Sequence, residues 1–161
     1  MKPSPDAKET VSRFEKLLVA LANSGIDFAV AGGLAVIFNG YPRLTLDVDI
    51  LVSDAPENLR KLLDCLSHWG EGWARELKPE DFMLPQPGAI RVIEEFDLDI
   101  FTRMGGKALD YFRPRLRHIK AGHVSIPHLS PADLIFLKQD SSRDKDKLDV
   151  AAMKEILARE R

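Results

Sequence analysis

Two aspartates, Asp47 and Asp49, lie two residues apart in the segment Leu-Thr-Leu-Asp-Val-Asp-Ile-Leu-Val of residues 44–52. Residues two apart in a β-strand point to the same face, with α-carbons about 6.5 to 7 Å apart, so both carboxylates can reach one or two divalent ions. Magnesium would relieve the repulsion between the acids and bridge nucleotide phosphates, and a second ion about 3.5 to 4 Å away could activate the attacking oxygen. The pair therefore predicts a metal site that can hold two magnesium ions and bind the phosphates of a nucleotide such as a nucleoside triphosphate (NTP).

A glycine pair, Gly32-Gly33, stands ten residues before Arg43 and directly follows the apolar run Phe-Ala-Val-Ala of residues 28–31. Glycine allows backbone amides to approach phosphate oxygens closely, and a helix that starts there offers its amino end to the same charge. Phosphoryl and nucleotidyl transfer depend mainly on positioning and on charge neutralisation. The glycines thus predict a phosphate-binding turn, with Arg43 and Lys138 as candidate cations.

These residues resemble the signature of the nucleotidyltransferase superfamily that includes DNA polymerase beta: a Gly-Gly turn, a spacer, Asp-hydrophobic-Asp and a later third acid. The stretch Arg43-x-Thr45-x-Asp47-Val48-Asp49 resembles in particular the bacterial minimal nucleotidyltransferases and the abortive-infection, AbiEii-type toxin relatives. Those relatives are also similar to this chain near its end. The matching residues there are Asp133-Leu134-Ile135-x-x-Lys138, Arg143-Asp144 and Asp149-Val150, so the resemblance spans residues 28–150.

The resemblance implies a role for each matching residue. Asp47, Asp49 and a third acid would form the catalytic and metal-binding set, and the third acid would help to deprotonate the acceptor hydroxyl. Asp99 is the first choice for that acid, because Asp99-Ile100-Phe101-Thr102 resembles the strand of the family, and Asp97 on the same strand face is the alternative. The nucleotide would contact Gly32, Gly33, Arg43, Thr45 and Lys138, with Lys138 at the triphosphate.

The implied reaction is magnesium-dependent transfer of a nucleoside monophosphate from an NTP to an acceptor hydroxyl, with release of pyrophosphate. The acceptor is left open between RNA such as tRNA, a protein and a small molecule. A different class of function is the alternative: a non-catalytic protein of this fold that binds a small helical partner protein in a toxin–antitoxin pair.

Each motif also has a purely structural interpretation. A lone Asp-x-Asp, or the pair Asp97 and Asp99, can simply be the solvated face of a strand, and Gly32-Gly33 can be an ordinary turn. Lys138 and the stretch 143–149 can form surface ion pairs that stabilise little. One basic cluster could contact nucleic-acid phosphates, although charge runs usually face water. Its members are Arg113, Arg115, Arg117, His118 and Lys120.

The elements that must position these residues follow from hydrophobic spacing and from turn signals. We expect an α/β fold of the nucleotidyltransferase type, a mixed β-sheet with the acids on one face and helices packed behind it. In the strand 44–52, strict alternation predicts Leu44 and Leu46 on the apolar face, and a last helix over 145–159 is expected to turn Leu148 inward. Ser130-Pro131 is typical of a helix start, and residues 70–88 are expected to form a long loop. The remaining predictions are helices over 8–23, 34–38, 53–66 and 107–112, a strand over 28–31, two strands or one bent strand over 89–94 and 96–102, and a short strand pair over 117–126.

Size and composition are those of one ordinary globular domain over residues 1–161, with 45% hydrophobic and 30% charged residues. Lys and Arg total 23 against 25 Asp and Glu, so no overall basic field favours nucleic acid. The single cysteine, Cys65, cannot form an intrachain disulfide and is expected in the core, which fits a reducing compartment. Without a signal-like start or an apolar run near the ~20 residues that a bilayer needs, we expect a cytoplasmic protein that does not enter membranes.

Overall fold

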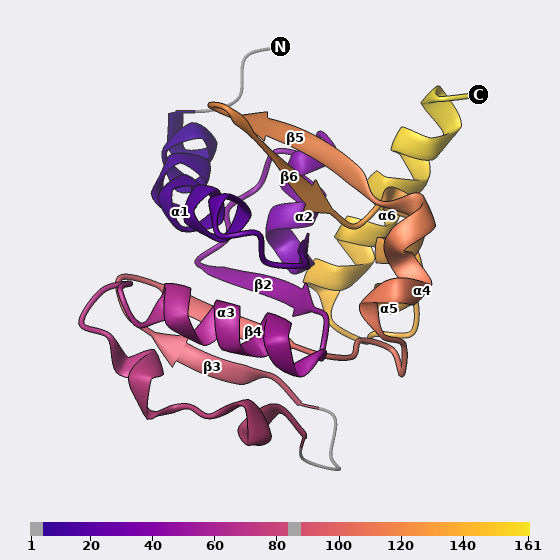
Figure 1. The fold of residues 1–161 in the computed structure, drawn as a ribbon. Coiled ribbons are helices and arrows are strands. Elements are labelled where there is room, and N and C mark those ends of the chain that lie inside the picture. Colours follow the sequence, from indigo (N-terminus) through magenta and orange to yellow (C-terminus); the bar gives the residue numbers. More distant parts are fainter. Residues whose placement is uncertain (1–4, 84–87) are drawn as a thin grey trace.

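A single six-stranded mixed sheet is the framework of the structure, a computed structural model that describes residues 5–83 and 88–161 (Figure 1). The strand order is β3-β4-β2-β1-β6-β5. The strands are β1 Phe28–Ala31, β2 Asp47–Val52, β3 Ile90–Ile93, β4 Asp97–Phe101, β5 Arg117–Ala121 and β6 Val124–His128. The expected α/β fold with a mixed sheet is confirmed.

In the described part of the chain six α-helices flank this sheet, and most begin and end close to where the sequence signals place them. They are α1 Pro5–Asn23, α2 Gly32–Phe38, α3 Pro56–Leu66, α4 Leu109–Phe112, α5 Pro131–Lys138 and α6 Asp144–Arg159. The start of α5 is the predicted cap, since the hydroxyl of Ser130 accepts a hydrogen bond from the backbone N–H of Asp133 at 3.2 Å. None of the helices in the described ranges has the length and apolar character that a membrane crossing requires.

Strand β2 lies in the middle of the sheet and carries the first two acids. It pairs antiparallel with β1, which places Asp49 opposite Ala31, the residue before the glycine pair. On its other side it pairs in parallel with β4, which places Asp49 opposite Asp99 and Asp47 opposite Asp97. The register of these two ladders therefore brings the glycine turn and all the candidate acids to one place in the sheet.

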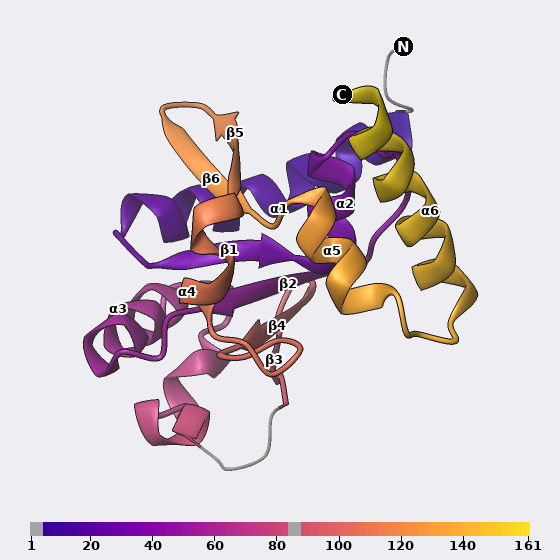
Figure 2. The ribbon, with the colours of Figure 1, turned by 90° about the vertical axis from the view of Figure 1, so that its right-hand side faces the viewer.

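Helices cover the two faces of the sheet unequally (Figure 2). Helices α1 and α3 lie on the face opposite the acids: the ring of Phe14 meets that of Phe96 edge-on at 4.6 Å, and Phe96 immediately precedes Asp97. Helices α5 and α6 pack against each other and against α2, on the side where the glycine turn lies. The acids are thus supported from behind by an apolar layer and approached from the side by α2, α5 and α6.

The predicted start of the second strand was wrong. β2 begins only at Asp47, and Leu44 and Leu46, expected on the apolar face, are 59% and 76% exposed. The reason is that β1 pairs with β2 only over residues 49–52 and β4 begins opposite Asp47. No neighbouring strand in the described ranges extends the ladder to residues 44–46. The alternating side chains there therefore have no sheet surface against which one face could be buried.

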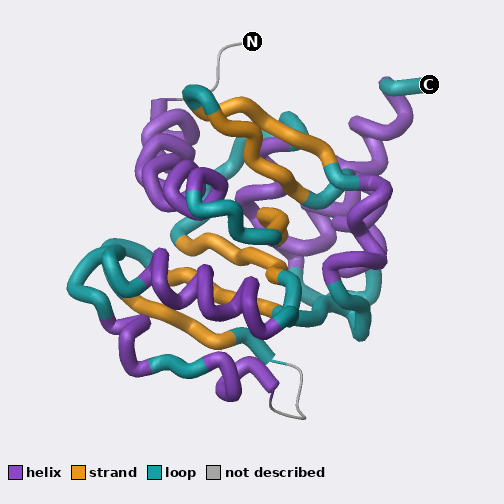
Figure 3. The backbone as a smooth tube through the Cα atoms, viewed as in Figure 1, coloured by secondary structure: helices purple, strands orange, loops and turns teal. Residues whose placement is uncertain are grey.

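The face assigned to the last helix was also wrong. Leu148 is 61% exposed, whereas Asp149 and Met153 are fully buried, so α6 is rotated relative to the prediction. Within the segment expected as a long loop, two short 3₁₀ helices, Trp73–Glu76 and Pro79–Met83, run along the outer side of β3 (Figure 3), and residues 84–87 lie outside the described ranges. Cys65, expected in the core, is only partly buried at its margin.

Candidate active site

Three carboxylates converge on the open face of the sheet. Asp47, Asp49 and Asp99 each offer an oxygen, and these oxygens all lie within 4.8 Å of one another. The arrangement follows from the pleat, which points residues 47 and 49 the same way, and from the parallel pairing of β2 with β4. Asp99 is buried and the other two acids are partly buried. Carboxylates at this spacing can share a hard divalent cation.

The charge in this cluster is not balanced by the protein alone. Burial, followed by the neighbouring charges of Asp47 and Asp99, raises the pKa of Asp49 to about 7, and the charge of Lys138 offsets only part of this rise. Asp49 resists ionisation because the nearby cations do not offset its burial and the charges of the two other acids. The residues present therefore fit a divalent ion, which would favour the ionised form of Asp49.

The third acid has a dedicated partner on the neighbouring edge strand. Arg91 lies opposite Asp99 in the β3–β4 ladder and forms a two-pronged ion pair with it, Nε to Oδ1 at 2.8 Å and Nη2 to Oδ2 at 2.9 Å. Its remaining nitrogen, Nη1, lies 3.4 Å from Oδ2 of Asp97. Asp97, the alternative third acid, is more exposed than Asp99, and the converging set contains Asp99.

The first glycine of the turn lies directly against the middle acid. Gly32 has φ +59°, a conformation that side chains disfavour, and a Cβ built on it would stand 2.9 Å from Cγ of Asp49 and closer still to Oδ2. Only glycine therefore allows the chain to turn into α2 so close to the acid pair. The close approach places the backbone of the turn beside the carboxylate that would hold the metal.

The second glycine lies against two further residues singled out in the sequence. A Cβ on Gly33 would stand 3.0 Å from Cζ of Arg43 and 3.1 Å from the hydroxyl oxygen of Thr45. That hydroxyl in turn lies 3.2 Å from the backbone oxygen of Asp47 and 3.4 Å from Oδ1 of its carboxylate. Gly33, Arg43, Thr45 and Asp47 thus form a continuous wall from the turn to the acids.

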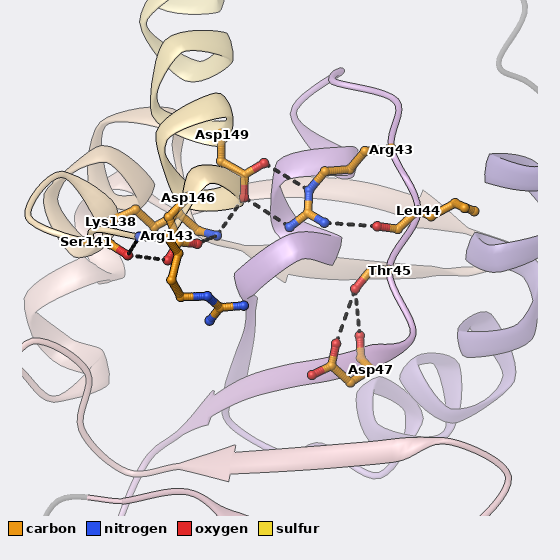
Figure 4. A network of polar contacts seen from close by, with 9 residues as sticks. All are labelled: Arg43, Leu44, Thr45, Asp47, Lys138, Ser141, Arg143, Asp146 and Asp149. Carbon is orange, nitrogen blue, oxygen red and sulfur yellow. Dashed lines mark hydrogen bonds and ion pairs between the residues drawn. The ribbon is translucent and has the colours of Figure 1, made fainter.

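A buried aspartate of the last helix connects the two candidate cations (Figure 4). Asp149, which is fully buried, accepts hydrogen bonds from Nη2 of Arg43 at 3.0 Å and from Nζ of Lys138 at 2.7 Å. Lys138 also donates to Asp146 at 3.1 Å, and Ser141 holds the other oxygen of Asp146. The cations are therefore held in place by acids of α6, and the interpretation of this stretch as surface ion pairs is wrong for Asp149.

The structure brings all eight residues singled out in the sequence into one connected neighbourhood. Two further members, Arg91 and Asp149, were not recognised as site residues from the sequence. The signal for Asp149 was its spacing of four and seven residues from Met153 and Ile156, which places an acid within the apolar stripe of α6. The signal for Arg91 was the short Glu94–Phe96 connection, since a hairpin centred there pairs residue 91 with residue 99.

The basic cluster that could have contacted nucleic acid is largely neutralised within the chain. Arg113 pairs with Asp27 at 2.7 Å, Arg115 with Asp133 at 3.0 Å and Arg117 with Glu160 at 2.6 Å. These guanidiniums are already committed to acids of the protein, so the cluster forms no free basic patch of arginines.

A cavity of about 410 Å³ lies along the β3 edge of the sheet. Arg91 contributes to its wall and touches Asp99 at the same time. Trp73 and Ile93, which are 54% and 60% exposed, give the cavity an apolar surface. The other lining residues are Glu76, Leu77 and Val92. The cavity is therefore a partly apolar pocket, connected to the third acid through its lining residue Arg91.

One family model and several solved structures match this chain. A family model described as "Nucleotidyltransferase of unknown function (DUF6036)" matches residues 11–158, and no curated protein matches the sequence. Among solved structures, the fold is similar to the lincomycin-bound lincosamide antibiotic adenylyltransferase LnuA, with TM-score 0.59, 17% identity, and 90% of this chain and 96% of that chain covered.

Two other solved structures are similar over most of the chain. An antigenic nucleotidyltransferase-like protein from Paracoccidioides brasiliensis has TM-score 0.55 and 16% identity, with 95% of this chain and 77% of that chain covered. A candidate nucleotidyltransferase from Thermotoga maritima, TM1012, has TM-score 0.53 and 16% identity, with 99% and 97% covered. At these identities the similarity establishes the fold.

Proposed function

Because the chain belongs to this nucleotidyltransferase family of unknown function, we propose that it transfers a nucleoside monophosphate from an NTP to an acceptor hydroxyl in a magnesium-dependent reaction. The observation that carries the proposal is the convergence of Asp47, Asp49 and Asp99 within 4.8 Å of one another, beside the glycine turn. A fold alone does not determine activity, but this constellation has the parts that the chemistry requires.

The three acids would hold the divalent ion, which when bound neutralises charge on the phosphates and polarises the bond that breaks. Asp49 is central to this arrangement because it lies between Gly32 and the two other acids. Thr45 orients Asp47 through its hydroxyl. These contacts fix the carboxylates before a substrate arrives, which limits the reorganisation needed during the reaction.

The nucleotide would bind over the glycine turn, between the acids and the cations. Gly32 and Gly33 leave backbone atoms accessible where side chains would block approach. Arg43 adjoins Gly33, and Lys138 is close enough to influence Asp49 electrostatically. Both cations also bond to Asp149, which fixes their positions near the glycine turn, where they would contact the triphosphate.

The acceptor would enter from the other side of the acids, through the cavity at the β3 edge. Asp99 is connected to this cavity through Arg91, which bonds to the acid and contributes to the wall. An acceptor hydroxyl there would be close to the group proposed to assist its deprotonation. The half-exposed indole of Trp73 favours an acceptor with a flat or apolar part over an extended polyanion.

The proposal is tested by incubating the protein with each of the four NTPs labelled at the α-phosphate, in the presence and absence of magnesium. Total RNA, cell proteins and a panel of hydroxyl-bearing small molecules serve as acceptors. Asp47→Asn and Asp49→Asn should abolish incorporation, whereas Asp54→Asn, an exposed aspartate outside the site, should not. Incorporation that persists in both site variants would refute the proposal. Folded protein without magnesium-dependent NTP binding would favour the non-catalytic, protein-binding alternative.

A further inference from the structure

Arg91 occupies an unusual position for a cation in a proposed metal site. Its guanidinium uses two nitrogens to hold both oxygens of Asp99, at 2.8 and 2.9 Å, and a third lies 3.4 Å from Asp97. Four acids lie on this sheet face, Asp47 and Asp49 on β2 and Asp97 and Asp99 on β4. Among the described residues, Arg91 is the cation in direct contact with this group.

The ion pair is fixed by the fold as well as by charge. Arg91 and Asp99 are direct partners in the β3–β4 ladder. The β-carbons of residues at such positions are only about 4.5 to 5.5 Å apart. A planar guanidinium that holds a carboxylate with two parallel bonds is among the stronger polar contacts in proteins. It also keeps its charge at any physiological pH. The guanidinium of Arg91 therefore keeps a positive charge next to Asp99 at every physiological pH.

We propose that Arg91 provides the charge that a second divalent ion would otherwise supply, so that this site binds one ion among Asp47, Asp49 and Asp99. The inference rests on the proposed function, because it concerns the same acids. A two-ion arrangement needs ions about 3.5 to 4 Å apart that share carboxylates. Here the third carboxylate has both oxygens bonded to a guanidinium, whose charge opposes a second cation beside it.

A count of bound ions tests the inference without reliance on turnover. The protein is titrated with Mn²⁺ in the presence of an NTP analogue with a non-cleavable α,β bond, and bound Mn²⁺ is followed by electron paramagnetic resonance. We expect one Mn²⁺ per chain with the spectrum of an isolated ion. Arg91→Met, which removes the charge, should bind two ions with a spin-coupled spectrum, and Arg91→Lys, which keeps it, should bind one.

A matched control separates the effect of position from that of charge. Arg60 is an exposed arginine on α3, on the far face of the sheet, and donates only to the backbone of Pro56 at 3.4 Å. Arg60→Met should therefore bind one ion, as the wild type does. Because the side chain of Arg91 is 51% exposed on an edge strand, its replacement should leave the fold intact, which circular dichroism verifies.

The outcomes distinguish this inference from the proposed function. Two coupled ions in the wild type together with magnesium-dependent incorporation would overturn the role of Arg91 and leave the transferase proposal standing. One ion in both the wild type and Arg91→Met would also overturn it, because the charge of Arg91 would then not set the count. If the wild type binds no Mn²⁺, both proposals are wrong.

Discussion

Gly32 and Asp49 touch across the turn into α2, so that a side chain on the glycine would displace the carboxylate. Gly25 provides a matched position, because its φ of +70° is similarly left-handed but a Cβ there would meet nothing within 4 Å. Both Gly→Ala changes should lower the free energy of unfolding by about 1 to 2 kcal/mol from backbone strain.

Only Gly32→Ala should also weaken metal binding, because it moves Asp49. We expect its affinity for Mn²⁺ to fall by about tenfold or more, which is typical when a residue that orients a metal ligand is replaced. Isothermal titration calorimetry on both variants measures the difference. Equal affinities for Gly32→Ala and Gly25→Ala would show that the glycine does not position the acid.

Asp49→Asn should stabilise the metal-free protein in a pH-dependent manner. The folded-state pKa of Asp49 is raised to about 7 from 3.8, so the folded state binds the proton more tightly than the unfolded state. Stability of the wild type should therefore fall as the pH rises from about 4 to about 7 and then level off. Asparagine cannot ionise and so avoids this loss. Relative to the wild type, the free energy of unfolding of the variant should be almost unchanged near pH 4 and higher by on the order of 2 to 4 kcal/mol near pH 8.

The measurement is urea unfolding of wild type and variant in a chelator, at several values of pH. Asp54→Asn, an exposed aspartate, should show no comparable pH-dependent gain. A constant difference between Asp49→Asn and the wild type across the range would contradict the assignment of the raised pKa to this carboxyl.

Asp149→Ala should be one of the more damaging single substitutions in the chain. It leaves Arg43 and Lys138, whose side chains are only 13% and 14% exposed, without their shared acid. Removal of one partner from a buried ion pair commonly costs about 3 to 5 kcal/mol. Glu155→Ala, on the same helix, removes only an exposed pair with Arg159 and should cost less than about 1 kcal/mol.

Chemical denaturation followed by circular dichroism compares these two α6 variants. If Asp149→Ala were as stable as Glu155→Ala, the buried network would not be holding α6 against the rest of the protein.

Lys138→Met should clearly reduce the affinity for a nucleotide while it lowers the free energy of unfolding only moderately. Arg43 still neutralises Asp149 in this variant, so the loss of stability should be smaller than in Asp149→Ala. The loss of a charged donor at the proposed triphosphate should reduce the affinity for a non-cleavable ATP analogue by about tenfold or more. Fluorescence titration checks this, with Lys154→Met, an exposed lysine of α6, as the control that should bind normally.

The parts of the fold that depend on local signals could be predicted from the sequence. The glycine turn between β1 and α2 and the Ser130 cap of α5 lie where short-range backbone chemistry places them. Alternation also correctly put Asp47 and Asp49 on one face. The grouping of Asp99 with them was expected from a family resemblance, and the structure brings the three together; their catalytic roles remain predictions.

The predictions that were wrong concern residues whose burial depends on partners far away in the sequence. Leu46 was assigned to a buried face by alternation, but burial requires a neighbouring strand, and the sequence does not reveal where that neighbour ends. Asp149 was treated as a surface acid because charged residues usually face water. Its burial is favourable only because Arg43, from a distant segment, meets it there.

The contact between Arg43 and Asp149 joins residues 106 positions apart in the chain. A version truncated after residue 140 would lack Asp149 and Met153, both fully buried, so Arg43 would lose its buried acid and the core one of its members. The arginine beside the glycine turn therefore acquires its buried partner only after the last helix has been synthesised.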